Sequence, residues 1–332
     1  MSNGAKPASG RILVVRLGAL GDIIHALPAV ATLKHSFAGG HVSWAVEPRW
    51  APLLEENPFV DRVVLLRRGS LGGLAESWRD LRAARYEFAV DFQGLLKSAL
   101  VASAARPERI FGFHQSQVRE RAAALFYSNK TISRSAHVVD RNLELAAAAG
   151  GANAMLKFPL PPGRAESELP DGEFVLASPL AGWRAKQWPL EHYRALAGLL
   201  KRELGVRLVL DGPASAAPVL AQAEDAIPHA SSLAGLIYAT RRAAAVVGVD
   251  SGPLHVAAAL GKPGVAIYGP TDPARNGPYG DSMRVMRSES AVTTYQRGSS
   301  IDVSMARITP EQVFEELRSV LGKRYRSAGC RN

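Results

Sequence analysis

The chain has 332 residues, of which 47% are hydrophobic and 21% charged, and a formal net charge of +10, a composition that predicts a globular protein with two domains of ordinary size. No apolar run reaches the roughly 18–20 residues that a membrane span needs, and no secretory signal opens the chain, so we expect a cytoplasmic protein. The single cysteine, Cys330, excludes an intrachain disulfide and a Cys-based zinc cluster.

A strand, a turn and a helix are predicted at the start of the chain. Residues 11–17 are leucine-rich and β-branched, residues 18–22 read Gly-Ala-Leu-Gly-Asp, and residues 23–37 have apolar positions at helical spacing. The turn lacks the full glycine spacing of a dinucleotide-binding fingerprint, which disfavours the alternative of a nucleotide-dependent dehydrogenase. Asp22 lies at the helix N-terminus, where it could accept a proton from a substrate hydroxyl; an ordinary capping role is the alternative.

Strand-like and helix-like segments alternate through the rest of the first half. Strands are expected at 41–46, 62–66, 88–92 and 109–113, and helices at 52–56, 74–85, 96–105 and 137–149. Such alternation predicts a parallel sheet with helices on both faces.

The excess of basic residues is concentrated in the first half. Residues 1–160 contain 20 Lys and Arg against 13 Asp and Glu, and residues 161–332 contain 20 against 17. This excess suggests an anionic partner, and nucleic acid is less favoured than anionic lipid or an acidic sugar because no binding motif accompanies it. Scattered solubilising arginines and a non-catalytic lipid-docking module are the alternatives. The residues are Arg67, Arg68, Arg79, Arg82, Arg85, Lys97, Arg106, Arg109, Arg119, Arg121, Lys130 and Arg134.

A linker and a second alternating series follow. Prolines at 159, 161, 162 and 170 indicate a linker, so we expect one domain over residues 1–160 and another over 161–332. Strands are predicted at 174–177, 206–210, 244–249 and 264–268, and helices at 190–204, 217–226, 233–242, 256–260 and 309–322, with a basic tail from residue 323. The chain is therefore predicted to be an α/β protein with two Rossmann-like domains.

Two segments of the second half carry candidate chemistry. Residues 249–255, Val-Asp-Ser-Gly-Pro-Leu-His, read as a strand, a tight turn and a helix start, which is a phosphate-binding geometry; an ordinary cap is the alternative. Lys186 could bring a positive charge to a pyrophosphate, although a lone lysine in a loop is more often on the surface. No carboxylate pair or His cluster has metal-ligand spacing.

Five motifs in one order and spacing resemble those of the ADP-heptose:lipopolysaccharide heptosyltransferases, glycosyltransferase family 9. They are Gly21-Asp22, residues 91–98 (Asp-Phe-Gln-Gly-Leu-Leu-Lys-Ser), 183–189 (Trp-Arg-Ala-Lys-Gln-Trp-Pro), 250–255 and 268–273 (Tyr-Gly-Pro-Thr-Asp-Pro). Residues 91–98, 126–127 and 137–145 are most similar to the branch that adds the first heptose to Kdo-lipid A.

The resemblance implies a GT-B fold, in which two Rossmann-like domains face an interdomain cleft, and metal-independent, inverting transfer of heptose from ADP-heptose to a Kdo hydroxyl at the cytoplasmic face of the inner membrane. Asp22 matches the general base. The chain departs from the family at Ala214-Ser215-Ala216, where family members place a ribose-binding acid. The donor-binding positions implied are Ala181, Gly182, Lys186, Asp250, Ser251, Gly252 and His255, and the acceptor-binding positions are Gly21, Arg67, Arg68, Gln93, Lys97 and Arg119. A second-heptose transferase of the same family is the nearest alternative.

Overall fold

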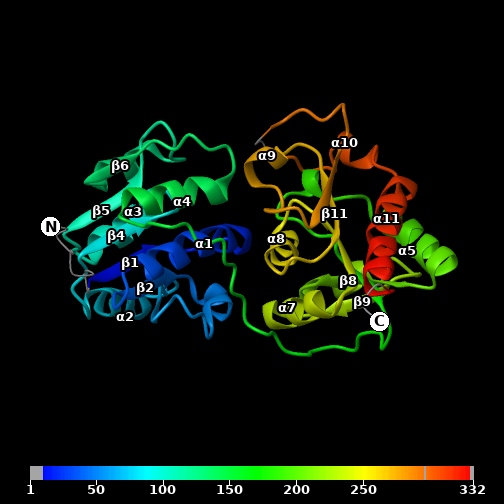
Figure 1. Ribbon diagram of the computed structural model, residues 1–332, viewed down its shortest axis with the longest axis horizontal. Helices are drawn as coiled ribbons and strands as arrows, with labels where there is room; N and C mark the ends of the chain where they lie inside the picture. Colours follow the sequence, from blue (N-terminus) through cyan, green and yellow to red (C-terminus); the bar gives the residue numbers. More distant parts are fainter. Residues whose placement is uncertain (1–9, 295–296, 330–332) are drawn as a thin grey trace. The chain divides into compact units, whose positions relative to one another are not determined.

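The computed structural model describes residues 10–294 and 297–329, and Cys330 lies outside them. The chain divides into two compact units, Met1–Pro161 (unit 1) and Pro162–Asn332 (unit 2), which Figure 1 shows in blue to green and in green to red. The division lies within the proline-rich stretch, one residue beyond the expected boundary. Each unit contains a six-stranded parallel sheet, which confirms the predicted α/β class.

The sheet of unit 1 has the strand order β3-β2-β1-β4-β5-β6. Residues 12–15 of β1 are completely buried, as expected for a strand that is covered on both faces. The strands are β1 (Arg11–Val15), β2 (His41–Val46), β3 (Arg62–Leu65), β4 (Phe88–Asp91), β5 (Arg109–Phe113) and β6 (Asn129–Thr131).

Helices cover both faces of this sheet. On one face α1 (Leu20–Ser36) packs against α4 (Val138–Ala148), where the Asn142 amide donates a hydrogen bond to the His25 carbonyl at 3.0 Å. Because parallel crossovers are right-handed, the helices that follow β3 and β4 lie on the opposite face. There α2 (Leu71–Arg82), α3 (Leu96–Ala104) and the 3-10 helix η2 (Arg121–Phe126) share one apolar cluster with Leu13 and Val15. A further 3-10 helix, η1 (Pro48–Leu54), follows β2.

Unit 2 repeats this architecture with the strand order β12-β11-β10-β7-β8-β9. One face of its sheet packs against α5 (Leu190–Leu204) and α11 (Pro310–Gly329), with Trp188 and Tyr193 in the buried cluster. Two further helices are α7 (Leu233–Arg242) and α8 (Gly252–Ala259), and the short ones are η3 (Arg184–Lys186), η4 (Ala214–Ala216), α6 (Ala217–Leu220), α9 (Pro273–Asn276) and α10 (Val303–Ala306). The strands are β7 (Phe174–Ser178), β8 (Arg207–Gly212), β9 (Ile227–Ala230), β10 (Ala245–Val249), β11 (Gly264–Tyr268) and β12 (Met283–Arg287).

Numbered within its own unit, each sheet has the order 3-2-1-4-5-6. The connections therefore leave the central strand pair in opposite directions, and the loops beyond the carboxyl ends of that pair separate to leave room for a ligand. In unit 1 the pair is β1 and β4, followed by Asp22 and by residues 91–98. In unit 2 the pair is β7 and β10, followed by Lys186 and Asp250.

Some predicted boundaries are wrong. Residues 52–54 belong to η1, not to an α-helix, and only residues 217–220 of the predicted helix 217–226 are helical. Beyond them, N–H groups of Ala223 and Ala226 donate to carbonyls three residues earlier and form turns. The C-terminal helix continues to Gly329, so the tail expected from residue 323 is helical up to that point. The short edge strands β6, β9 and β12 were absent from the expected elements.

Candidate functional site

Asp22 lies in the first turn of α1, directly beyond the end of β1. Its Oδ2 atom accepts a hydrogen bond from the Ala19 N–H at 3.3 Å and is 2.7 Å from Nη2 of Arg16. The Asp22 side chain is nevertheless 47% exposed. The carboxylate is thus fixed in direction and still open to a substrate, as a general base requires.

Arg16 is a partner of Asp22 that the sequence pattern did not reveal. Its side chain is only 9% exposed, and Nη1 donates to the Phe92 carbonyl at 2.6 Å. The guanidinium therefore connects the end of β1 with the end of β4. Because Arg16 is itself held by the sheet, it is a positioning residue for the Asp22 carboxylate.

A second set of contacts holds the same loop. Gln93, an expected acceptor-binding residue, accepts a hydrogen bond from the Leu17 N–H through Oε1 at 2.8 Å. Its own N–H donates to Asp91 at 2.8 Å, and this completely buried carboxylate also accepts from Ser98 at 2.8 Å and from Tyr127 at 2.7 Å. Burial raises the pKa of Asp91, and these hydrogen bonds oppose that change. Gln93 therefore supports the loop that leads into the first turn of α1, where Asp22 lies.

Two of the expected acceptor-binding cations meet at one carboxylate, Glu47, which directly follows β2. Arg68 forms an ion pair with Glu47, and the Lys97 ammonium is 3.7 Å from it. The Glu47 side chain is only 13% exposed. The backbone N–H of Glu47 donates a hydrogen bond to the Leu17 carbonyl at 3.1 Å. Arg67 instead pairs with Glu76 on α2 at 3.6 Å. The structure thus brings Arg68 and Lys97 to the same sheet edge as Asp22.

The other two expected acceptor-binding residues, Gly21 and Arg119, also lie at this edge of the sheet. Gly21 is in the first turn of α1, beside Asp22. Arg119 is exposed, and the neighbouring Glu120 carboxylate accepts the Leu96 N–H at the start of α3 at 2.7 Å. This contact places the loop around Arg119 next to the N-terminus of α3.

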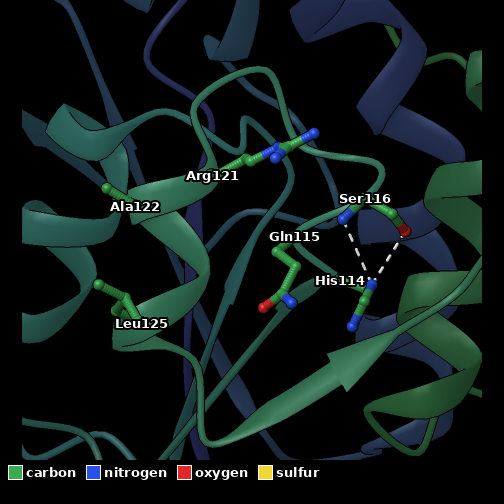
Figure 2. A pocket seen from close by; sticks show the side chains of 6 residues that line it. All are labelled: His114, Gln115, Ser116, Arg121, Ala122 and Leu125. Atoms are coloured by element: carbon green, nitrogen blue, oxygen red, sulfur yellow. Dashed lines mark hydrogen bonds between the residues drawn. The ribbon is translucent and has the colours of Figure 1, made fainter.

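A pocket of about 470 Å³ lies beyond the carboxyl end of β5 (Figure 2). Within it, Nδ1 of His114 lies 2.9 Å from Oγ of Ser116 and accepts the Ser116 N–H at 3.3 Å. Of the basic residues expected to face an anionic partner, Arg121 lines it. Its lining is completed by Gln115, Ala122 and Leu125.

In unit 2, Lys186 and Asp250 form one buried ion pair. The Lys186 ammonium is 2.6 Å from Asp250 Oδ2, and the two side chains are 16% and 5% exposed. Asn276 donates to Asp250 Oδ1 at 3.3 Å, and His255 Nε2 lies 3.8 Å from the same oxygen. Burial by itself would raise the pKa of Asp250, but the His255 hydrogen bond and the Lys186 charge outweigh it and hold the pKa well below its usual value.

Two hydroxyl groups in the segments that follow the adjacent strands β10 and β11 lack hydrogen-bond partners. In the described part of the chain, Ser251 Oγ and Thr271 Oγ1 are buried and accept or donate no hydrogen bond within the protein. Ser251 is the N-cap of α8 but its side chain makes no capping bond, and Gly252 begins the helix. Free hydroxyls at the carboxyl end of a sheet that also presents a cationic side chain and a helix N-terminus are suited to phosphate oxygens. The 268–273 motif was the sequence signal for Thr271.

Ala181 and Gly182 lie in the loop between β7 and η3. The Ala181 carbonyl accepts a hydrogen bond from the Gln187 amide at 3.3 Å, and Gly182 is exposed. A Cβ at Gly182 would meet no atom within 4 Å. The Lys186 ammonium lies over the ring of the next residue, Trp183, 4.4 Å from the ring centre.

The carboxyl ends of the neighbouring strands β8 and β9 carry polar groups close in sequence or register to the position where the resemblance expects a ribose-binding acid. Residues 214–216 form η4 and supply no carboxylate. Asp211, the residue before Gly212, accepts a hydrogen bond from Ser231 at 2.6 Å and lies 2.9 Å from His229 Nδ1. Asp211 falls at a strand end that the sequence pattern places at the ligand-binding side, whereas its partners His229 and Ser231 were not indicated by the sequence.

Two features are absent from the described residues. No group of three or more His, Cys, Asp or Glu side chains is arranged to hold a metal ion. None of the described helices combines the length and apolar character that a membrane span requires.

The chain is similar to known proteins over most of its length. Residues 74–302 match the model of glycosyltransferase family 9 (heptosyltransferase). Lipopolysaccharide heptosyltransferase 1 of Escherichia coli K12 is 31% identical to this chain, and the match covers 84% of this chain and 93% of the relative. Lipopolysaccharide heptosyltransferase 2 of Salmonella typhimurium is 30% identical, and the match covers 94% of this chain and 99% of the relative. The structure of E. coli heptosyltransferase WaaC with ADP-2-deoxy-2-fluoro heptose has a TM-score of 0.71 at 28% identity, covering 93% of this chain and 99% of that one.

Proposed function

Because the chain belongs to glycosyltransferase family 9, the heptosyltransferases, we propose that it transfers heptose from ADP-heptose to Kdo of Kdo-lipid A during synthesis of the lipopolysaccharide inner core. The single observation that carries this assignment is the pair of polar sites at the two sheet edges, an exposed oriented carboxylate in unit 1 and a cationic, hydroxyl-rich helix start in unit 2. The expected GT-B fold agrees with the solved heptosyltransferase structure.

Unit 2 has the groups that an ADP-sugar donor needs. During transfer the bond between the sugar C1 and the diphosphate oxygen breaks, and ADP leaves with the electron pair. Lys186, the first-turn N–H groups of α8 and the hydroxyls of Ser251 and Thr271 are suited to stabilise the negative charge that develops on ADP. Asp250 would hold Lys186 in place for this role.

Asp22 in unit 1 is the proposed general base. It would take the proton of the acceptor hydroxyl as that oxygen forms the new bond to C1 from the face opposite to ADP, which inverts the configuration. Such assistance typically contributes about 10²–10⁴-fold to the rate. Arg16 would keep Oδ2 fixed while the other oxygen receives the proton.

The basic side chains of unit 1 support an anionic acceptor. Arg68, Lys97 and Arg119 lie at the edge that carries Asp22, and the carboxylate of Kdo and the phosphates of lipid A have the complementary charge. We also propose that the transfer needs no metal ion and takes place at the cytoplasmic face of the inner membrane.

Assays of the purified protein with ADP-heptose and Kdo-lipid A test the proposal. We expect product formation, and a loss of about 10²–10⁴-fold in kcat for Asp22→Asn. The matched control is Glu191→Gln, an exposed acid in the first turn of α5. Equal activity with and without EDTA is expected if no metal takes part. Less than a tenfold loss for Asp22→Asn would refute the assigned base.

A second-heptose transferase is the other candidate, since a heptosyltransferase 2 is 30% identical over 94% of this chain. Acceptors with and without a first heptose separate the two. Preference for the acceptor that lacks heptose supports our assignment, and preference for the one that carries it supports the alternative.

A further inference from the structure

Large apolar side chains are exposed on one layer of unit 1. Of the twelve exposed large hydrophobic residues in the described part of the chain, six belong to the layer formed by α2, α3 and η2. Leu71 is 87% exposed, Leu125 81% and Trp78 49%. Such a concentration is unusual on a surface that only meets water. The six are Leu71, Leu74, Trp78, Leu96, Leu100 and Leu125.

Helix α2 has one side buried against the unit and a second, apolar side that is exposed. Gly73, Ser77 and Leu81 are buried toward the sheet, at a spacing of four residues. Leu71, Leu74 and Trp78 follow the spacing i, i+3 and i+7 and therefore share another side of the helix, which is exposed. The sheet already packs against the first side, so the second side is left exposed among the described residues of unit 1.

Helices α2 and α3 belong to one continuous layer. The Arg82 Nε atom, at the end of α2, donates a hydrogen bond to the Ala104 carbonyl at the end of α3 at 3.1 Å. Leu81 of α2 and Ala99 of α3 lie in the same buried cluster. We call the outer side of α2, α3 and η2, with the six exposed apolar residues, the apolar-basic surface.

Basic side chains surround the apolar ones. Arg79 and Arg82 are exposed on α2, and the Arg82 guanidinium lies 3.9 Å from the ring centre of Trp78. The acids of the helix are already paired, Glu76 with Arg67 and Asp80 with Arg62. Leucine and tryptophan beside arginine is the composition of helices that lie in the interface of an anionic bilayer.

We propose that the apolar-basic surface docks the protein on an anionic lipid bilayer. The leucines and Trp78 would enter the boundary between headgroups and acyl chains, and Arg79 and Arg82 would contact lipid phosphates. This inference rests on the proposed function in one respect, since a lipid-borne acceptor requires the enzyme to work at a membrane. The charge of the surface favours lipid over a second copy of this chain, which would carry the same positive charge.

Sedimentation of the full chain with vesicles tests the proposal. Vesicles of phosphatidylglycerol and phosphatidylcholine should bind the protein at least tenfold more tightly than vesicles of phosphatidylcholine alone, and raised salt should weaken binding. The variant Leu71→Gln/Leu74→Gln/Trp78→Gln should lose at least tenfold in binding. Its control is Val219→Gln/Val285→Gln/Val292→Gln, at exposed apolar positions of unit 2, which should bind like wild type.

Activity on a deacylated, water-soluble Kdo acceptor separates this proposal from the function. The α2 variant should retain wild-type kcat on that acceptor, which also shows that it is folded, and lose activity on Kdo-lipid A in vesicles. An inactive wild type that still binds anionic vesicles through α2 would overturn the function and leave the docking surface standing. Wild-type binding by the α2 variant, or a dimer that only this variant disrupts, would overturn the docking surface.

Discussion

Replacing Lys186 with methionine tests how unit 2 holds a buried carboxylate. The change removes the ammonium 2.6 Å from Asp250 but retains an unbranched side chain. Loss of one partner from a buried ion pair costs about 3–5 kcal/mol, and we take ~3 kcal/mol because Asn276 and His255 still contact Asp250. For a unit of this size that predicts a Tm lower by roughly 6–12 °C.

Urea unfolding and calorimetric titration with ADP measure the two consequences of this change. Adding Asp250→Asn to Lys186→Met removes the unpaired charge, so the double variant should regain most of the lost free energy of unfolding. Lys201→Met, at an exposed position of α5, is the matched control. Affinity for ADP should fall in every variant that lacks Lys186. An unfolding free energy of Lys186→Met within about 0.5 kcal/mol of wild type would refute the reasoning.

Three further changes have defined outcomes. Arg16→Met should lower kcat about tenfold, or 1.4 kcal/mol, without changing the KM for ADP-heptose, and steady-state kinetics would contradict us by showing equal kcat. Tyr127→Phe should cost about 1.5–3 kcal/mol in chemical unfolding by removing a bond to buried Asp91, whereas Tyr86→Phe, which removes a buried hydroxyl without a partner, should cost nothing. The pKa of Asp250 in the folded protein lies below the usual 3.8. The ionised carboxylate therefore stabilises the fold above pH 3.8, and this stabilisation is lost as the pH falls from there through the pKa of the folded state. In acid unfolding, the stability of Asp250→Asn should therefore begin to approach that of wild type below about pH 4.

The central strands of both sheets were predictable because burial on two faces requires continuous apolar residues. Residues 12–15 and 245–249 are such runs, and all of them are buried. Edge strands are under no such constraint, and β6, with the sequence Asn-Lys-Thr, has no apolar residue at all. The helix predicted at 217–226 has good helical propensity, but after Leu220 the chain forms turns that lead into β9.

The positions of single candidate residues could be predicted from the sequence, but the contacts between side chains from different loops could not. Asp22, Lys186 and Asp250 were identified because the carboxyl ends of the central strands are the ligand-binding edge of such sheets. The contacts of Arg16 with Asp22 and of Glu47 with Arg68 join residues on different loops, so the linear pattern could not indicate them.

The repeated strand order has a consequence for how such enzymes diversify. Since the chain passes from unit 1 to unit 2 once, between Pro161 and Pro162, each half carries its whole sheet in an unbroken stretch of sequence. A recombination event at that single crossing would exchange the whole of unit 2, which holds the proposed donor site, without cutting any strand. Under the proposed division of donor and acceptor binding between the units, new pairings of the two substrates can therefore arise by exchange of halves, with neither half remodelled.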